Sequence, residues 1–109
     1  MDSYFVVEEI QSFNWKPNLD IRKQNQWQEH ADFMNNLEAE GFVVLGGPMY
    51  SENKAKKDYI HRALLIIDAE SENTILKRFS EDPWIKNSLL KVNWIKKWDI
   101  LLNRNSPVR

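Results

Sequence analysis

The chain has 109 residues, a length at which one domain spanning residues 1–109 is expected, because domains run from about 50 to 250 residues. Apolar residues make up 42% and charged residues 28%, which is typical of a folded globular protein and excludes a disordered chain. The net charge of -1 gives no general attraction to nucleic acid or anionic lipid, and the lack of cysteine excludes disulfides and thiolate catalysis.

Nothing in the chain indicates a membrane or secreted protein. No apolar run approaches the roughly 18 residues of a membrane span, and the first residues lack the basic start and apolar core of a signal peptide. The two histidines do not form an H-E-x-x-H motif, and no cysteine is available to ligate a metal. We therefore expect a soluble cytoplasmic protein with no metal, no cofactor and no membrane partner.

The first third of the chain predicts a strand, a loop and a helix. Residues 4–10 are rich in β-branched and aromatic side chains, which favours a strand, and the polar residues 11–23 favour a loop. From Asn25 the period changes to that of an amphipathic helix, which Asn25 and Gln28 are expected to cap as a capping box. The apolar arc of this helix consists of Trp27, Ala31, Phe33, Met34 and Leu37.

Two short apolar segments follow the helix, which Gly41 is expected to end. Residues 42–45 predict a second strand, closed by the turn residues Gly46-Gly47-Pro48. Residues 49–59 are polar and predict a loop longer than the usual hairpin connection. Residues 63–67 are apolar at every position and predict a third strand that is covered on both faces.

The last third predicts two helical segments and a strand. Ser71 is a good cap for a helix, and Asp82-Pro83 starts a shorter helical segment, with proline where its missing N–H costs nothing. The buried stripe of the longer helix is expected to contain Ile75, Leu76 and Phe79. One face of the final strand is expected to carry Val92, Trp94, Trp98, Ile100 and Leu102.

The order βαββαβ predicts an α+β fold of the ferredoxin-like plait type. In this fold a four-stranded antiparallel sheet carries both helices on one face. Because the helices cover only that face, while the second and third strands are apolar throughout, the open face needs another cover. We therefore expect a homodimer in which two sheets face each other.

His30 is the residue that best suits chemistry. It lies near the centre of the apolar arc of the first helix, so its imidazole should point into the domain. It is either a core histidine bonded to a backbone carbonyl or a general acid or base, since imidazole titrates near neutrality. Asp82 is its candidate partner, although capping the segment that begins at Pro83 is a sufficient role by itself.

Three sequence pieces resemble the YCII-related (YciI-like) family when they are taken in order. They are Trp27-Gln28-Glu29-His30-Ala31, Leu45-Gly46-Gly47-Pro48 and Glu81-Asp82-Pro83-Trp84. The resemblance implies a dimeric α/β barrel of two ferredoxin-like subunits, with a pocket between helices and sheet. By motif, His30 and Asp82 would be its catalytic pair.

A small-molecule ligand is the partner that this resemblance implies. Many relatives have an arginine three residues before the histidine, where this chain has Trp27, and Arg22 is the candidate replacement. An aromatic or apolar ligand suits Trp27 better than a highly charged one. The residues expected to bind it are Trp27, Met34, Gly46, Gly47, Pro48, Trp84 and Arg22.

Two classes of function remain open from the sequence. One is an enzyme that performs acid/base chemistry, an elimination or isomerisation, on a small cyclic or aromatic substrate. The other is a non-catalytic binder or accessory subunit on the same scaffold, and a haem- or oxygen-dependent monooxygenase of the same barrel form is a further alternative. RNA binding is not expected, because residues 61–67 of the third strand contain no aromatic side chain.

Overall fold

The computed structural model describes residues 3–53 and 56–104. Within these ranges, no helix is long and apolar enough to cross a membrane. The elements in chain order are β1 (Ser3–Gln11), the 3-10 helix η1 (Ile21–Lys23), α1 (Trp27–Ala39), β2 (Val43–Asn53), β3 (Lys56–Ala69), α2 (Glu72–Phe79), α3 (Pro83–Lys86) and β4 (Leu90–Lys97).

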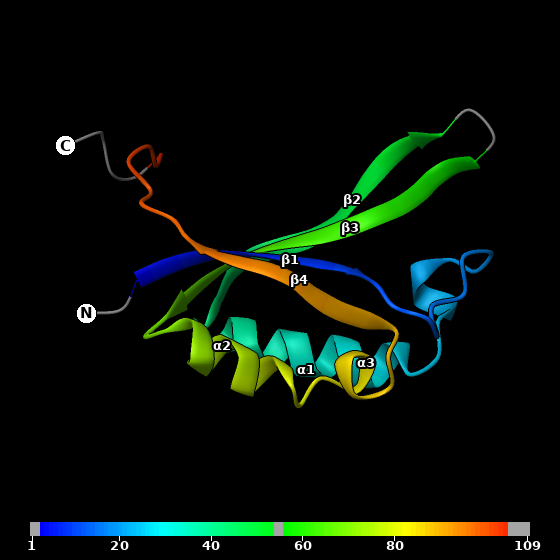
Figure 1. Ribbon diagram of the computed structural model, residues 1–109, viewed down its shortest axis with the longest axis horizontal. Helices are drawn as coiled ribbons and strands as arrows, with labels where there is room; N and C mark the ends of the chain where they lie inside the picture. Colours follow the sequence, from blue (N-terminus) through cyan, green and yellow to red (C-terminus); the bar gives the residue numbers. More distant parts are fainter. Residues whose placement is uncertain (1–2, 54–55, 105–109) are drawn as a thin grey trace.

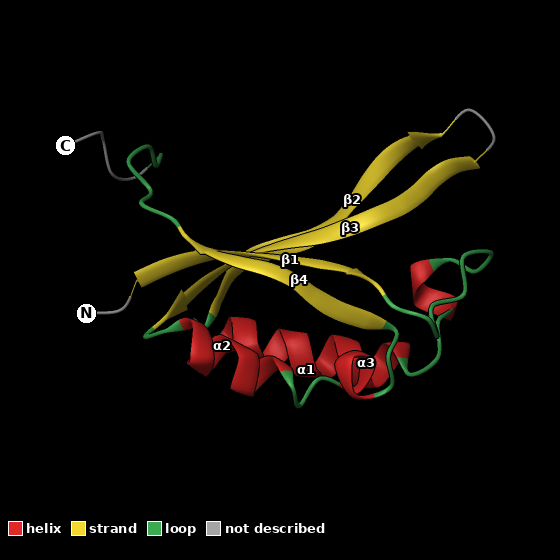
Figure 2. Ribbon diagram, viewed as in Figure 1, coloured by secondary structure: helices red, strands yellow, loops and turns green. Residues whose placement is uncertain are grey.

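The four strands form one antiparallel sheet in the order β2-β3-β1-β4. Helices α1, α2 and α3 all lie below this sheet, and no helix formed by residues 3–53 or 56–104 covers its other face (Figure 1). The separation of strands and helices into two layers is plain when the ribbon is coloured by element (Figure 2). The predicted α+β ferredoxin-like fold is therefore confirmed.

The main core lies between the sheet and α1 and α2. Alternate residues of β1 point towards the helices, so Phe5 and Val7 are buried against α1 and α2. The buried members of this core are Phe5, Val7, Leu37, Phe42, Val43, Leu65, Ile67, Ala69, Ile75 and Phe79. A second, smaller cluster of Trp15, Trp84, Leu89 and Leu90 closes the end of the sheet near α3.

The hairpin of β2 and β3 is longer than predicted. Gly46-Gly47-Pro48 does not form a turn but lies inside β2, and the predicted loop at 49–59 is replaced by strand up to Asn53 and from Lys56. Backbone pairing holds these polar ends together, so no apolar pattern marks them in the sequence. Pro48 is tolerated because β2 is an edge strand.

Gly46 is needed for close packing inside the hairpin. A Cβ atom at this position would lie 2.9 Å from Cγ of Leu65, which is its partner in β3. Real Cβ atoms do not come so close to another carbon, so any larger residue would displace Leu65 from the core. Because glycine has no side chain, β2 can lie close to β3 at this position.

A β-bulge in β4 overturns the predicted common face of that strand. Glu8 of β1 lies opposite Trp94, and the next pair joins Glu9 to Val92, so Asn93 is the extra residue. The bulge turns the side chains of Val92 and Trp94 to opposite faces. Val92 packs against the core, whereas Trp94 lies on the open face beside Glu8.

The last strand also ends earlier than predicted, at Lys97. Trp98 follows the strand, although its backbone N–H still donates to the Tyr4 carbonyl at 2.9 Å. Ile100 and Leu102 lie beyond the strand, and Leu102 is 77% exposed. The apolar alternation of this segment therefore continues past the point where the sheet stops.

The helices differ from prediction in two details. The N-cap of α1 is Gln26, in the left-handed region with φ 58°, and no side chain caps this end. Asn25 instead accepts a hydrogen bond at its carbonyl from Trp84 Nε1, and Gln28 donates to Asp32, so the predicted capping box is wrong. In α2, Leu76 is exposed rather than part of the buried stripe.

Candidate functional site

His30 of α1 and Asp82, just before α3, meet in the structure. The His30 Nδ1 atom lies 2.9 Å from Oδ1 and 3.0 Å from Oδ2 of Asp82. The Asp82 side chain is almost fully buried, and that of His30 is 12% exposed. Because an ionised carboxylate only accepts hydrogen bonds, this contact places the proton of a neutral imidazole on Nδ1 and the lone pair on Nε2.

Asp82 is held rigidly because it also caps α3. Its Oδ1 accepts a hydrogen bond from the Trp84 backbone N–H at 3.0 Å. Pro83 follows at the first helical position, where proline favours the start of a helix. The predicted capping role and the contact with His30 therefore coexist on one carboxylate, which gives the imidazole a fixed partner.

Tryptophan rings surround the imidazole. The Trp84 ring stacks on that of His30, with centroids 3.8 Å apart and planes 6° from parallel. Trp27 lies on the same face of α1 one turn before His30. Its ring centroid is 6.1 Å from that of His30 and 5.8 Å from that of Trp84. The sequence predicts no position for Trp15. In the structure it packs edge-to-face with Trp84, with ring centroids 5.4 Å apart. These contacts leave the imidazole little rotational freedom.

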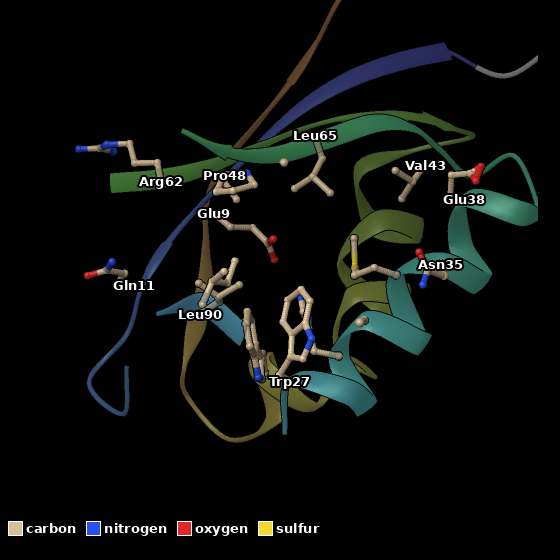
Figure 3. A pocket seen from close by; sticks show the side chains of 18 of the residues that line it. Glu9, Gln11, Trp27, Asn35, Glu38, Val43, Pro48, Arg62, Leu65 and Leu90 are labelled. Carbon is tan, nitrogen blue, oxygen red and sulfur yellow. The ribbon is translucent and has the colours of Figure 1, made fainter. Parts of the chain in front are cut away.

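A pocket of about 480 Å³ opens between α1 and the sheet beside this pair (Figure 3). His30 and Trp27 form one wall, and β2, β3 and the end of β1 form the opposite wall. Most of the lining is apolar, which suits a small organic ligand. The predicted binding residues found in the lining are Trp27, Met34, Gly46, Gly47, Pro48 and Trp84.

Arg22 is the predicted binding residue that does not line this pocket. It belongs to η1, and its guanidinium carbon lies over the Trp27 ring, 5.7 Å from the ring centroid. A cation in this position supports the tryptophan through its π face. Arg22 therefore contacts a residue of the pocket wall and not the pocket space itself.

Glu9 is a pocket residue that sequence reasoning missed. It is only 2% exposed, and its side chain points from β1 into the pocket (Figure 3). Burial raises the pKa of the Glu9 carboxyl to about 8, and the charge of Asp82 adds to this rise. A signal was present, since Glu9 continues the alternation of Phe5 and Val7 towards the core.

The pocket contains acid/base groups but no cluster suited to a metal. Over residues 3–53 and 56–104, no group of three His, Cys, Asp or Glu side chains is arranged to hold a metal ion. The polar groups around the pocket can instead bind a ligand by hydrogen bonds and move protons.

A model of the YCII-related domain matches residues 14–99 of the chain. The match includes α1, β2 and the segment around Asp82, so the resemblance seen in the sequence is confirmed. No curated protein sequence matches the chain.

A solved structure shares the fold. It is 5-chloro-2-hydroxyhydroquinone dehydrochlorinase (TftG) from Burkholderia phenoliruptrix AC1100 in complex with 2,5-dihydroxybenzoquinone. The two chains superpose with a TM-score of 0.64 and are 19% identical, over 94% of this chain and 98% of that chain. At this identity the likeness establishes the common fold.

Proposed function

Since this chain belongs to the YCII-related family, we propose that it is an enzyme that uses His30 as an acid/base catalyst on a small planar substrate. The reaction class is elimination or isomerisation, which needs only the transfer of protons. The observation that carries this proposal is the contact of His30 Nδ1 with buried Asp82 beside an apolar pocket.

In the proposed reaction, His30 Nε2 takes a proton from the substrate. The imidazolium that forms is stabilised by the adjacent Asp82 carboxylate, which stays ionised and keeps the ring oriented. In an elimination, the electron pair left on the substrate expels a leaving group as an anion. In an isomerisation, His30 returns the proton at another position of the substrate.

The pocket favours an aromatic or quinone-like substrate. Its volume is about 480 Å³, and flat tryptophan rings lie beside His30. Flat rings stack well on such surfaces. The substrate and ligand named for TftG are a chlorinated hydroxyhydroquinone and a dihydroxybenzoquinone, and this chemistry supports the same broad class here.

The proposed function predicts that the purified protein captures a small aromatic compound. Native mass spectrometry of protein exposed to a metabolite extract should reveal a bound mass, and a crystal soaked with that compound should place it within hydrogen-bond reach of His30 Nε2. We call it the captured compound. A compound bound away from His30, or bound there without ever being converted, would contradict catalysis, and the second result would favour the non-catalytic binder.

We also propose that the open face of the sheet packs against a second copy of the chain. Val6, Ile66 and Trp94 lie on this face according to their strand pairing, and each is only partly buried. Leu45, paired with Ile66, is 60% exposed. An exposed apolar patch over a sheet is typical of a protein interface.

This arrangement predicts a mass in solution of twice the 13.0 kDa of the chain. Ile66→Lys should produce a monomer, because it places a charge at the centre of the apolar face. Leu76→Lys is the matched control, since Leu76 is exposed on α2, and it should remain a dimer. Analytical ultracentrifugation at micromolar concentration measures both variants, and a monomeric parent protein would refute the proposed interface.

A further inference from the structure

Two consecutive glutamates of β1 have opposite environments. Glu8 points to the open face, where its Oε1 accepts hydrogen bonds from Arg62 at 2.6 Å and from Asn93 at 2.7 Å. Glu9 points to the other face, into the pocket. Among the described residues, no side chain donates a hydrogen bond to its carboxyl, although the residue is more buried than Glu8.

Among the described residues, no side-chain N or O atom that is fully sealed from solvent lacks a hydrogen-bond partner. The Glu9 carboxyl accepts no hydrogen bond there, so its oxygens keep contact with the space of the pocket. Burial of a polar group costs free energy unless a hydrogen bond compensates for the lost water. The Glu9 carboxyl points towards the middle of the pocket, between Leu90 and Leu65 (Figure 3). A molecule in the pocket is therefore the natural partner for this carboxyl.

The charges around Glu9 favour its neutral form. Asp82, before α3, is negative and close enough to act on it, while α1 contributes His30 and, among the residues of the lining, Glu38. On the sheet side, Arg62 of β3 borders the pocket, and its guanidinium pairs with Glu8, whereas β4 contributes the apolar Leu90 (Figure 3). No cation on these elements is directed at the Glu9 carboxyl in the described part of the chain.

We propose that Glu9 is a substrate-binding residue that donates a hydrogen bond from its neutral carboxylic acid to a carbonyl oxygen of the ligand. This inference rests on the proposed function and deepens it, because it assigns a carbonyl to the substrate. When His30 removes a proton from the substrate, negative charge moves onto that oxygen. A preorganised donor aimed at the oxygen stabilises the charge as it develops.

Three aromatic probes of similar size test this assignment at equilibrium. Acetophenone carries a carbonyl acceptor, ethylbenzene lacks it, and 1-phenylethylamine is a cation. At pH 6, wild-type protein should bind acetophenone about 3- to 10-fold more tightly than ethylbenzene, the effect of one hydrogen bond. The preference should persist in His30→Ala, which separates it from catalysis, and should vanish in Glu9→Leu.

Further variants and pH distinguish the acid from its anion. Glu9→Gln keeps a donor, so it should keep part of the preference at every pH, whereas the wild-type preference should be lost above about pH 8. Equal binding of acetophenone and ethylbenzene, or tightest binding of the amine at pH 6, would overturn the proposal.

Infrared spectroscopy provides an independent measurement that requires no ligand. At pH 6 the wild-type spectrum should contain the C=O band of a buried protonated carboxylic acid, and this band should be missing in Glu9→Gln. If both proteins give the same spectrum in this region, Glu9 is ionised and the proposal fails, whatever the probes do. A band that is present while His30→Ala retains full turnover would instead refute the proposed function alone.

Discussion

His30→Ala should lower kcat for the captured compound by about 10²- to 10⁴-fold, the usual contribution of a positioned acid/base group. Binding of the compound should change much less, because the pocket is lined mostly by other side chains. Stopped-flow or steady-state assays measure kcat, and calorimetry measures binding. Full turnover by His30→Ala would show that another group carries the proton.

Variants of Asp82 separate its catalytic role from its structural role. Asp82→Asn should keep the cap on α3 and cost less than about 1 kcal/mol of stability, since both residues cap well. It should still lower kcat, because an amide cannot stabilise the imidazolium. Asp82→Ala should in addition lower the free energy of unfolding by about 2–4 kcal/mol, because it removes the cap and leaves Nδ1 of His30 unpaired.

Glu9 should make the stability of the protein fall as the pH rises from about 5 to about 8. Burial raises the pKa of its carboxyl from an ordinary value of 4.5 to about 8. Between these values the native state holds a proton that the unfolded state has released, so each pH unit removes about 1.4 kcal/mol of stability. The full loss is about 3–5 kcal/mol, and the stabilising effect of the proton is complete only below pH 4.5.

Glu9→Gln is the control that isolates this effect from other titrating groups. The variant and the wild type should have similar unfolding free energies near pH 5, and the variant should be more stable by several kcal/mol near pH 8. Urea denaturation at constant protein concentration gives both curves, which keeps any contribution of a dimer fixed. Parallel curves across this range would mean that Glu9 is not protonated in the folded protein.

Local periodicity was sufficient to predict the fold. The alternation of Phe5 and Val7, the arc around Leu37 and the cap at Ser71 each have a local cause that survives in the structure. The bulge at Asn93 was not predictable, because it depends on pairing with β1, far away in the sequence. The polar ends of β2 and β3 were missed since they are held by backbone pairing.

Part of the site was also visible in the sequence. His30 lies on an apolar helical face and Asp82 precedes a proline, and these patterns located both members of the pair. Trp15 lies in a loop, where no periodicity indicates burial, so its contact with Trp84 emerges only in three dimensions. Glu9 was overlooked because a charged residue in an apolar strand resembles a solvent-facing position unless its alternation with Val7 is followed.

The state of the His30 ring is the most direct test of the account, since His30 is proposed to offer the lone pair of Nε2 to the substrate. Nitrogen-15 NMR of histidine-labelled protein can report it, and His61→Gln assigns the signals because the chain has two histidines. In the neutral form of the ring we expect the proton on Nδ1, and we expect an Nε2 signal that shifts when the captured compound is added. A proton on Nε2, or an Nε2 signal that responds neither to pH nor to the compound, would identify His30 as a core histidine and contradict the account.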